Sequence, residues 1–388
     1  MSNPISSRRS LLKAFAAVLP LAVTGTAGAQ MQAIRPLARP LRVALVAPAS
    51  GSPVALTGPF VHGLTPVLRR AGIELSLHLT GPRTKQIVQA AHTALAQRPD
   101  ALIALGDGLA RLMQPALETA TLPVIAAEVG ARMPDAERPL PLSLSASLQA
   151  WEAEWMHGAL LGQQGAPVHL FISVLESGYD LPFAFSAGLT SVRGHLTGTT
   201  ILNGQSAAGA ARAAQQSGAA HVHLLASEWA GAADFVQSCT RLGLGVSVGG
   251  LTAGSPRRAL SLPDAASAGA LSAAKELGQT GWKQGLHAAP THALTALGYD
   301  IGLWISAAAQ PLTQFTAQAL FGSLASVQVA GVRGLLSVNS AGQLRAPLRL
   351  QEASGRQSVL DGVPTMHPLL VAHRTGLRSG WIQPYLHG

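Results

Sequence analysis

The chain has 388 residues, of which 48% are hydrophobic and 12% are charged, and its formal net charge is +9. This length exceeds one ordinary core and predicts two lobes of about 150 residues each, while the apolar content excludes an intrinsically disordered chain. The arginines are scattered, with Arg69–Arg70 and Arg257–Arg258 as the only adjacent pairs beyond the first 30 residues, so nucleic-acid binding is not expected.

The first 29 residues have the pattern of a bacterial signal peptide. Arg8 and Arg9 precede the apolar stretch 14–23, and the small residues Ala27-Gly28-Ala29 form an A-x-A cleavage site for signal peptidase. The sequence SRRSLLK resembles the twin-arginine type, and a merely basic Sec signal is the alternative. We therefore expect cleavage after Ala29, a short leader over residues 30–40, and a protein located in the periplasm.

Apolar runs and helical periodicity alternate over the first third of the mature chain. A buried strand at 41–47, a Pro/Gly/Ser-rich loop at 48–59 and an amphipathic helix open the pattern. Further strands are predicted at 73–79, 101–105 and 122–127, and further helices at 84–97 and 109–120. Four strands with a helix after each of the first three predict a parallel, doubly wound sheet.

Residues 131–145 contain three prolines and no periodicity, and we interpret them as the first crossover between lobes. The alternation then restarts, with helices predicted at 148–161, 182–192, 207–217 and 232–242, and strands at 168–174, 199–202, 221–226 and 246–248. Helices at 265–286 and 293–309 and a strand-like tail at 326–349 follow. We expect lobe one to contain 41–135 and about 270–320, and lobe two 146–265 and about 326–388.

This order of elements resembles the type I periplasmic solute-binding proteins, the leucine/isoleucine/valine-binding class that serves ABC importers. The resemblance covers about residues 41–350 and is carried by the strand followed by Pro48-Ala-Ser-Gly51, by Gly58 and Gly63, by the helix containing Gly298-Tyr-Asp300, and by the turn Asn339-Ser-Ala-Gly342. It implies an α/β fold of two Rossmann-like lobes joined by three crossovers. It also implies a monomer, without cofactor or enzymatic activity, that captures a small polar ligand between the lobes and presents it to an ABC permease in the inner membrane.

The resemblance also implies where the ligand is held, because the family takes its ligand residues from loops that follow the strands. The positions of this chain that match are Ser50, Ser52, Asp107, Gly108, Arg111, Glu128 and Tyr179. The serines and Arg111 suit an anionic group, Glu128 suits a cationic or hydroxyl group, and Tyr179 lines the cleft. The alternatives are a helix cap for Asp107, a solvent-facing Arg111, and a solvated loop carboxylate for Glu128.

Side-chain hydroxyls are missing where amino-acid binders of this family usually carry them. The matching positions here are Ala110, Val129 and Gly130. A second hypothesis is therefore a relative whose ligand site has degenerated and which regulates or senses an envelope partner protein.

Enzymatic and metal-dependent functions are not expected. The sequence contains no HExxH, Walker or CxxC motif, and no nucleophile–base pair is recognisable from the sequence. The single cysteine, Cys239, is predicted to be a small buried residue. His221 and His223 are predicted to share one face of a strand in a structural role, because no third metal ligand is apparent. Trp151 and Trp155 are expected to be core residues.

Overall fold

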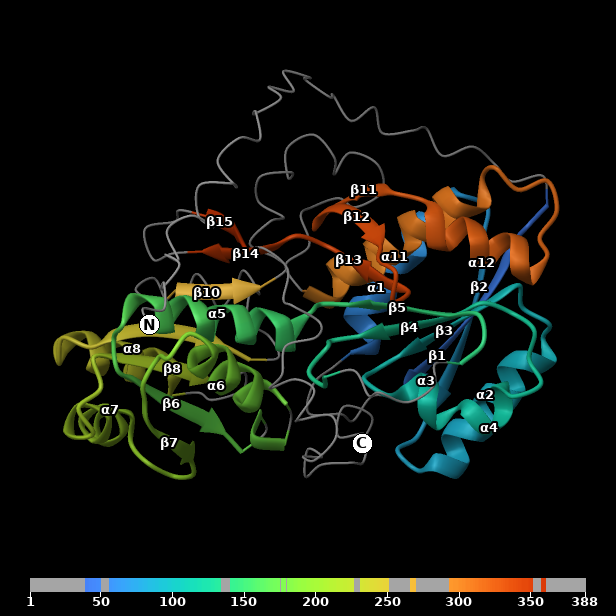
Figure 1. Ribbon diagram of the computed structural model, residues 1–388. Helices are drawn as coiled ribbons and strands as arrows, with labels where there is room; N and C mark the ends of the chain where they lie inside the picture. The colour runs from blue at the N-terminus through green and yellow to red at the C-terminus, as the bar shows by residue number, and fades with distance from the viewer. Residues whose placement is uncertain are drawn as a thin grey trace, which may run out of the picture. The chain divides into compact units, whose positions relative to one another are not determined.

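The computed structural model describes residues 39–49, 56–133, 140–174, 176–178, 180–226, 231–250, 266–269, 293–351 and 357–360. The strands of this part of the chain form two sheets (Figure 1). The predicted signal peptide and nearly all of the leader lie outside the described residues.

The first sheet has eight strands in the order β11-β12-β13-β5-β4-β3-β1-β2. It consists of β1 (Arg42–Pro48), β2 (Glu74–Thr80), β3 (Ala101–Leu105), β4 (Val124–Glu128), β5 (Ser143–Ser147), β11 (Val329–Gly331), β12 (Gly334–Val338) and β13 (Gln343–Arg345). All pairs from β2 to β13 are parallel, whereas β12 pairs antiparallel with both β11 and β13. The carboxyl ends of β3, β4 and β5 consequently lie at one edge of the sheet.

Helices pack on both faces of this sheet. Alternate residues of β1 divide between two cores, with Val43 and Leu45 in one and Ala44 and Val46 in the other. The first core includes residues of α1 (Thr57–Arg70), α11 (Ala293–Ala309) and α12 (Ala317–Ser326), and the second includes residues of α2 (Thr84–Ala96), α3 (Leu109–Leu112) and α4 (Gln114–Leu117). The continuous apolar strand in the sequence is thus explained by burial on both sides.

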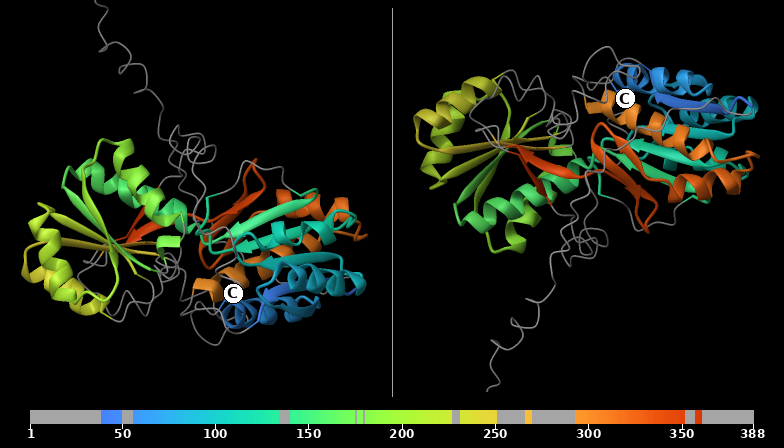
Figure 2. Two further views of the ribbon diagram at one scale, coloured as in Figure 1. Left: turned by 90° about the horizontal axis from the view of Figure 1, so that it is seen from below. Right: turned by 90° about the horizontal axis from the view of Figure 1, so that it is seen from above.

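The second sheet has seven strands in the order β15-β14-β10-β9-β8-β6-β7. Its strands are β6 (Val168–Ser173), β7 (Leu196–Leu202), β8 (His221–Leu225), β9 (Gly245–Gly249), β10 (Ala266–Gly269), β14 (Leu348–Gln351) and β15 (Gln357–Leu360). Helices cover both of its faces (Figure 2), namely α5 (Ala150–Gln164) and α6 (Leu181–Ser191) on one, and α7 (Ala207–Gln216) and α8 (Ala232–Arg241) on the other. A short 3-10 helix, η1 (Glu176–Gly178), precedes α6.

Each sheet carries one pair of helices that approach closely through glycine. In the pair α1–α11, a Cβ on Gly63 would collide with the carbonyl oxygen of Thr295, and a Cβ on Gly298 with that of Phe60. The pair α5–α6 uses Gly158 and Gly188 in the same reciprocal way, against the carbonyl oxygens of Phe185 and Trp155. The absence of a side chain at these positions lets the two backbones touch.

The predicted fold class, two doubly wound sheets with mainly parallel strands, is confirmed. Trp151 and Trp155 are core residues as predicted, with 6% and 3% of their surface exposed. The turn at Asn339–Gly342 also forms as predicted and joins β12 to β13, with Asn339 Oδ1 accepting the N–H groups of Ala341 and Gln343 at 3.0 Å.

Four expectations about the elements are wrong. Residues 143–145, expected at the end of the crossover, belong instead to the strand β5, because Leu144 and Ala146 alternate with serines and enter the core. The helix expected at 109–120 is two short helices, α3 and α4, separated at Met113 just before Pro115, which has no N–H to donate. Residues 266–269 form β10 instead of a helix because they pair with β9 and β14.

The fourth difference concerns the tail. Strands β11 to β13, expected with lobe two, pair into the eight-stranded sheet, and only β14 and β15 join the seven-stranded one. The antiparallel hairpin β12–β13 extends the first sheet because Leu344 pairs in parallel with Ala146 of β5 and enters the same core.

Candidate functional site

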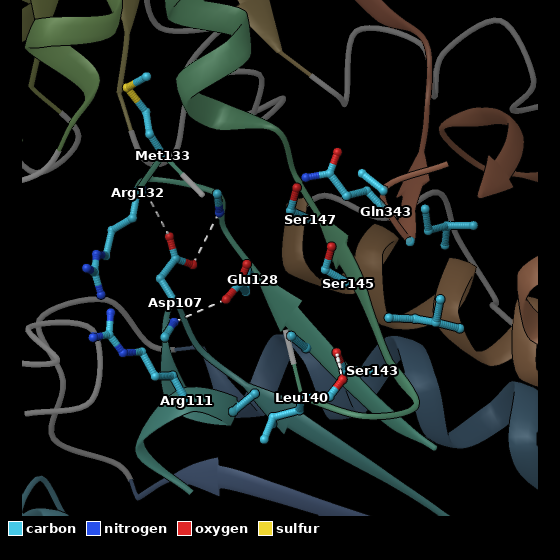
Figure 3. A pocket seen from close by; sticks show the side chains of 18 of the residues that line it. Asp107, Arg111, Glu128, Arg132, Met133, Leu140, Ser143, Ser145, Ser147 and Gln343 are labelled. Carbon is cyan, nitrogen blue, oxygen red and sulfur yellow. Dashed lines mark hydrogen bonds between the residues drawn. The ribbon is translucent and has the colours of Figure 1, made fainter. Parts of the chain in front are cut away.

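A cavity of about 420 Å³ opens at the carboxyl ends of β3 and β4 and along β5 and β13 (Figure 3). This volume is within the range of small-molecule sites. Its lining comes from the β3–α3 turn, α3, the segment after β4, one face of β5, the start of α5 and β13. The residues used below are Asp107, Gly108, Arg111, Glu128, Arg132, Met133, Leu140, Ser143, Ser145, Ser147, Gln343 and Arg345.

Asp107 fixes the backbone of the segment after β4. Its Oδ1 accepts the N–H groups of Val129 at 2.7 Å and Gly130 at 3.2 Å, and its Oδ2 accepts those of Ala131 at 2.6 Å and Arg132 at 3.3 Å. Burial raises the pKa of this carboxyl, while the four backbone donors act to lower it. Because each oxygen accepts two N–H groups, the arrangement suits the carboxylate ion.

The helix cap expected for Asp107 is therefore wrong. Gly108 occupies the position before α3, and no side chain caps that helix. Asp107 lines the pocket, but its carboxylate binds backbone N–H groups 22 to 25 residues later in the chain, which no local pattern indicates.

Glu128 is the last residue of β4 and lies directly beside Asp107 in the pocket (Figure 3). Its Oε1 accepts the N–H of Gly108 at 3.1 Å. Burial and, secondarily, the negative charge of Asp107 raise the pKa of Glu128 to about 7, against the opposing effect of Arg132. The alternative of a solvated loop carboxylate is wrong, because Glu128 is partly buried and hydrogen-bonded.

Two arginines reach the same side of the pocket. Arg111 extends from α3 and Arg132 from the segment after β4, and their guanidinium groups lie near one another in Figure 3. Gly108 has a φ of +80°, and a Cβ at this position would come within 3.0 Å of Arg132 Nη1. The positive φ thus favours glycine at this turn, and a side chain here would also touch the flexible end of Arg132.

The opposite side of the pocket is formed by a row of serines. Ser143, Ser145 and Ser147 alternate with Leu144 and Ala146 along β5. Ser143 Oγ donates to the carbonyl of Leu140 at 2.7 Å, and Ser147 Oγ accepts the N–H of Gln149 at 3.2 Å. Because the alternate residues enter the core, the hydroxyls face the cavity.

The sequence-predicted site residues are thus only partly brought together. Asp107, Gly108, Arg111 and Glu128 line one pocket, whereas Ser50, Ser52 and Tyr179 lie outside the described residues. Sequence reasoning missed Arg132, the β5 serines and Gln343. The alternation Ser-Leu-Ser-Ala-Ser was the signal that could have identified β5 and its hydroxyl face.

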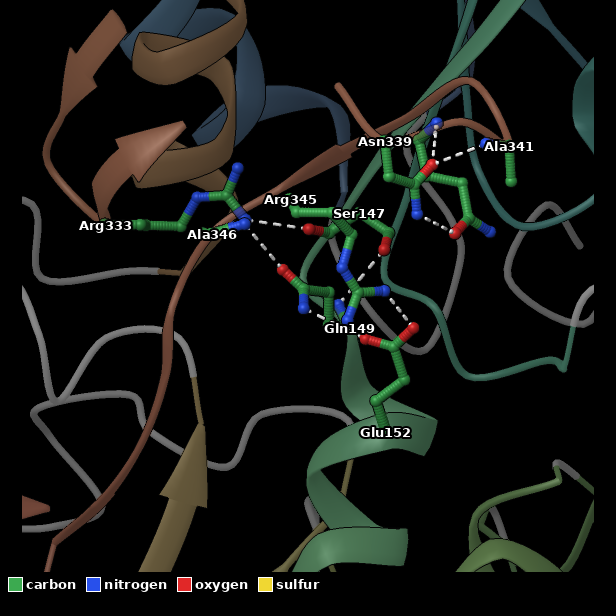
Figure 4. A network of polar contacts seen from close by, with 9 residues as sticks. Ser147, Gln149, Glu152, Arg333, Asn339, Ala341, Arg345 and Ala346 are labelled. Carbon is green, nitrogen blue, oxygen red and sulfur yellow. Dashed lines mark hydrogen bonds and ion pairs between the residues drawn. The ribbon is translucent and has the colours of Figure 1, made fainter. Parts of the chain in front are cut away.

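A polar network ties the segment between β5 and α5 to the segment between β13 and β14 (Figure 4). Gln149 accepts the N–H of Ala346 through Oε1 at 2.9 Å and donates from Nε2 to Glu152 at 2.9 Å. Glu152 also forms an ion pair with Arg345. At both of these segments the chain crosses from one sheet to the other, and the two crossover segments are hydrogen-bonded to each other.

The fully buried Arg333 adds a further link to this network. Its Nη1 donates to the carbonyl of Ser147 at 2.7 Å, and its Nε to Asp300 at 2.6 Å. Both members of the Arg333–Asp300 pair are 0% exposed, so removal of either one would leave a buried charge without its partner.

A second polar cluster is buried in the seven-stranded sheet. Ser247 Oγ contacts His221 Nε2 at 2.9 Å and His223 Nδ1 at 2.8 Å, and His223 Nε2 contacts Glu154 Oε2 at 2.8 Å. The sequence around Ser247, Gly-Val-Ser-Val-Gly, also matches the G-x-S-x-G pattern of hydrolases, which the sequence analysis did not recognise.

This serine–histidine–glutamate chain is nevertheless structural. Ser247 and His223 are 0% exposed, and Ser247 lies in the middle of β9 instead of on the sharp turn that exposes a nucleophilic serine. The ring of Phe185 stacks on His223 at 4.0 Å between centroids and closes the cluster further. A substrate has no access to the serine, so the predicted structural role of His221 and His223 is supported.

Cys239 is buried among apolar residues of α8 and the neighbouring strands, as predicted, and burial raises the pKa of its thiol to about 12. Within the described ranges, no group of three or more side chains is arranged to hold a metal ion. None of the helices in the described part of the chain is long and apolar enough to cross a membrane.

Comparison with known proteins gives a clear result at the level of the fold. No family model and no curated protein matches the sequence. Among solved structures, a benzoate-bound solute-binding protein of an ABC transporter from R. palustris is 16% identical with a TM-score of 0.62, over 84% of this chain and 97% of that one. A leucine-binding protein from Thermotoga maritima is 14% identical with a TM-score of 0.59, over 83% and 98%.

A branched-chain amino acid transporter substrate-binding protein from Streptococcus pneumoniae, solved with isoleucine, is 11% identical with a TM-score of 0.60, over 84% of this chain and 99% of that chain. The chain therefore has the type I periplasmic binding protein fold, as the sequence pattern predicted. The names of these structural neighbours describe binding proteins, two of them of transporters, and not enzymes.

Proposed function

We propose that this chain is an exported periplasmic solute-binding protein that captures a small polar ligand and presents it to an ABC permease. The single observation that carries the proposal is the pocket at the carboxyl ends of β3 and β4, which is where open α/β sheets bind ligands. The fold supports it, since the structural neighbours described above bind benzoate, leucine or isoleucine.

The proposed activity is reversible binding of the ligand, without any chemical conversion of it. Arg111, Glu128 and the hydroxyls of β5 offer convergent hydrogen-bonding groups around a cavity of about 420 Å³. Such a site needs only a difference in affinity between protein conformations to convert binding into a signal for the permease. Export rests on the sequence pattern at residues 1–29, and a monomer is expected.

A thermal-shift screen of the protein purified from the periplasm, after expression of the full chain, tests this proposal. The panel contains amino acids, amides, carboxylates and short peptides. A ligand present at 100 times its Kd should stabilise the folded state by about 2.7 kcal/mol. A hit should lose its shift when Arg111→Gln or Ser145→Ala is introduced, whereas Arg212→Gln, an exposed substitution on α7, should retain it.

A well-folded protein that responds to no member of the panel would contradict ligand capture. The second candidate function, a regulator or sensor of an envelope partner, would then be preferred. A specific observation favours it: Ala110 and Gly130 line the pocket but supply no side-chain hydroxyl. Permease and ATPase genes beside this gene would support the transporter role, and cell-wall or sensor genes the partner role.

A further inference from the structure

The three carboxyl groups that line the pocket differ in how many hydrogen-bond and ion-pair partners they have. Glu152 is paired with Arg345 and also accepts a hydrogen bond from Gln149. Asp107 accepts four backbone N–H groups. Glu128 is the remaining carboxyl, and its hydrogen bond to Gly108 uses one of its oxygens.

The basic side of the pocket consists of Arg111 and Arg132. Their guanidinium groups lie on the same side of the cavity as Glu128 and Asp107 (Figure 3). Guanidinium groups recognise carboxylates through paired N–H donors. An anionic end of a ligand is therefore attracted to this side of the pocket whenever Glu128 is uncharged.

The rest of the lining suits an uncharged body. The hydroxyls of Ser143 and Ser145 lie among apolar contributions from Leu140, Leu144 and Met133. This surface offers hydrogen bonds to a ring or chain bearing hydroxyl groups. Of the other carboxyls in the described lining, Asp107 is engaged by four backbone N–H groups and Glu152 by Arg345 and Gln149. Among the carboxyls in the described part of the lining, Glu128 is therefore the one best placed to receive an α-ammonium.

We propose that the pocket binds a small carboxylate that carries no ammonium group, with its anionic end at Arg111 and Arg132, and that this binding is coupled to proton uptake at Glu128. This inference rests on the proposed function and names the class of its ligand. It follows from the cavity, from the two guanidinium groups at one end and from the engagement of the other two acidic side chains.

The sign of the pH dependence follows from the groups that face Glu128. These are Asp107 at the end of β3, Arg111 on α3, and Arg132 on the segment after β4, with Glu152 on α5 and Arg345 on β13 farther along the lining. Since the pKa of Glu128 is about 7, its negative charge is present above neutral pH and opposes a bound anion. Affinity for a carboxylate should therefore fall as the pH rises through 7, whereas affinity for an amino acid held through its ammonium should rise.

Isothermal titration calorimetry with matched ligand pairs tests the proposal on the exported protein. The pairs are L-leucine against 4-methylpentanoate, which lacks only the ammonium, and benzoate against benzamide, which lacks the charge. We expect 4-methylpentanoate or benzoate to bind and its matched partner to bind at least tenfold more weakly. Affinity for the carboxylate should fall about tenfold between pH 6 and pH 8.5, the equivalent of one pKa unit of coupling.

Proton uptake is measured directly by repeating the titration at pH 7 in buffers of different ionisation enthalpy. A group with a pKa near 7 should take up about half a proton for each ligand bound. Glu128→Gln can still accept the N–H of Gly108 but cannot titrate, so this variant should bind the carboxylate with an affinity independent of pH and without proton uptake. Arg212→Gln is the matched control for Arg111→Gln and Arg132→Gln, which should weaken binding at least tenfold.

The outcomes separate the two proposals. Binding of L-leucine in preference to 4-methylpentanoate, or loss of binding in Glu128→Gln, would overturn the carboxylate inference and leave solute binding intact. Equal binding of benzoate and benzamide would do the same. No binding of any of these four ligands overturns the carboxylate inference, and silence of the wider amino-acid, amide and peptide panel as well would overturn the proposed function.

Discussion

Asp107 is the residue on which the geometry of the pocket depends most directly. Its carboxylate holds four consecutive backbone N–H groups, from Val129 to Arg132, in the segment that carries one wall of the pocket. Buried hydrogen bonds to a charged group contribute more than neutral ones. The loop after β4 therefore owes its conformation to a side chain supplied by the loop after β3.

We predict that Asp107→Asn destabilises the protein by about 2–4 kcal/mol, because the amide NH₂ would face two backbone donors and leave them unsatisfied. Urea denaturation measures the change in unfolding free energy. The control is Glu118→Gln, which alters an exposed carboxyl 11 residues later in the chain and should change stability by less than about 0.5 kcal/mol. Equal, small effects of the two substitutions would show that the carboxylate does not hold the segment.

At the same scale, the sequence predicted the parts of the pocket that follow strands in the chain. Asp107, Arg111 and Glu128 were predicted because the resembled family takes its ligand residues from loops after strands, and the ends of β3 and β4 are visible in the sequence. Gln343 and Arg345 could not be found in this way, since they reach the pocket only because β13 pairs with β5 about 200 residues earlier in the chain. Their positions depend on tertiary pairing and not on local pattern.

At the scale of elements, the pairs α1–α11 and α5–α6 share one packing device. In both, reciprocal glycines allow the backbone of one helix to touch the backbone of the other. In the first pair the contact joins a helix near the start of the described chain to one that begins at Ala293. The two lobes thus use the same solution, although the sequence shows no literal repeat.

We predict that Gly298→Ala destabilises the protein by about 2 kcal/mol or more, because a Cβ at this position meets the carbonyl oxygen of Phe60 and must separate the helices. The matched control is Gly322→Ala in α12, where no atom lies within 4 Å of the added Cβ. This change should be neutral or stabilising by up to about 1 kcal/mol, through helix propensity. Similar effects of both substitutions in chemical denaturation would argue against the close helix contact.

The elements that sequence reasoning misjudged are those in which pairing overrides local preference. Residues 266–269, Ala-Ser-Ala-Gly, carry weak strand signals, yet β10 forms between β9 and β14. The long helix expected at 109–120 failed at Pro115, a breaker visible in the sequence. Strands with continuous apolar runs, such as β1 and β3, were predicted well because burial on both faces leaves an unmistakable composition.

At the scale of the whole molecule, the buried ionisable groups give stability a defined pH dependence. Burial, the largest cause, lowers the pKa values of His157 and His223 to about 3 and that of His221 to about 4. The stability that these imidazoles contribute is complete above their unfolded pKa near 6.5 and is lost as the pH falls towards 3. Folding therefore becomes less favourable in acid, because the unfolded chain takes up protons that the folded chain excludes.

Glu154 acts in the opposite direction. Burial raises its pKa to about 7, so its contribution is complete below the unfolded value of 4.5 and is lost as the pH rises through 7. We predict that Glu154→Gln removes this loss: relative to wild type, the variant should gain about 3 kcal/mol between pH 4.5 and pH 8. Urea denaturation over this pH range is the measurement, with exposed Glu74→Gln as the control.

A difference between Glu154→Gln and wild type that does not vary with pH would contradict this assignment. It would mean that Glu154 is ionised in the folded protein throughout the range, as the partner of a charged His223. The two cases differ in where stability is lost: a buried neutral carboxyl loses its contribution as the pH rises through 7, whereas a carboxylate stabilised by an imidazolium would have a lowered pKa and would lose its contribution only in acid.

Cys239 gives the molecule a reporter group of its own. It is the one thiol of the chain, it lies on the buried face of α8, and only its thiolate reacts with electrophiles. A thiol-specific reagent consequently modifies the native protein only when the α7–α8 side of the seven-stranded sheet opens, and the rate of labelling counts those openings. The pocket is built mainly on the other sheet. If ligand binding at the pocket slows the labelling of Cys239, the opening of one lobe is coupled to the other; if the labelling rate does not change, the two lobes open independently. No engineered probe is needed.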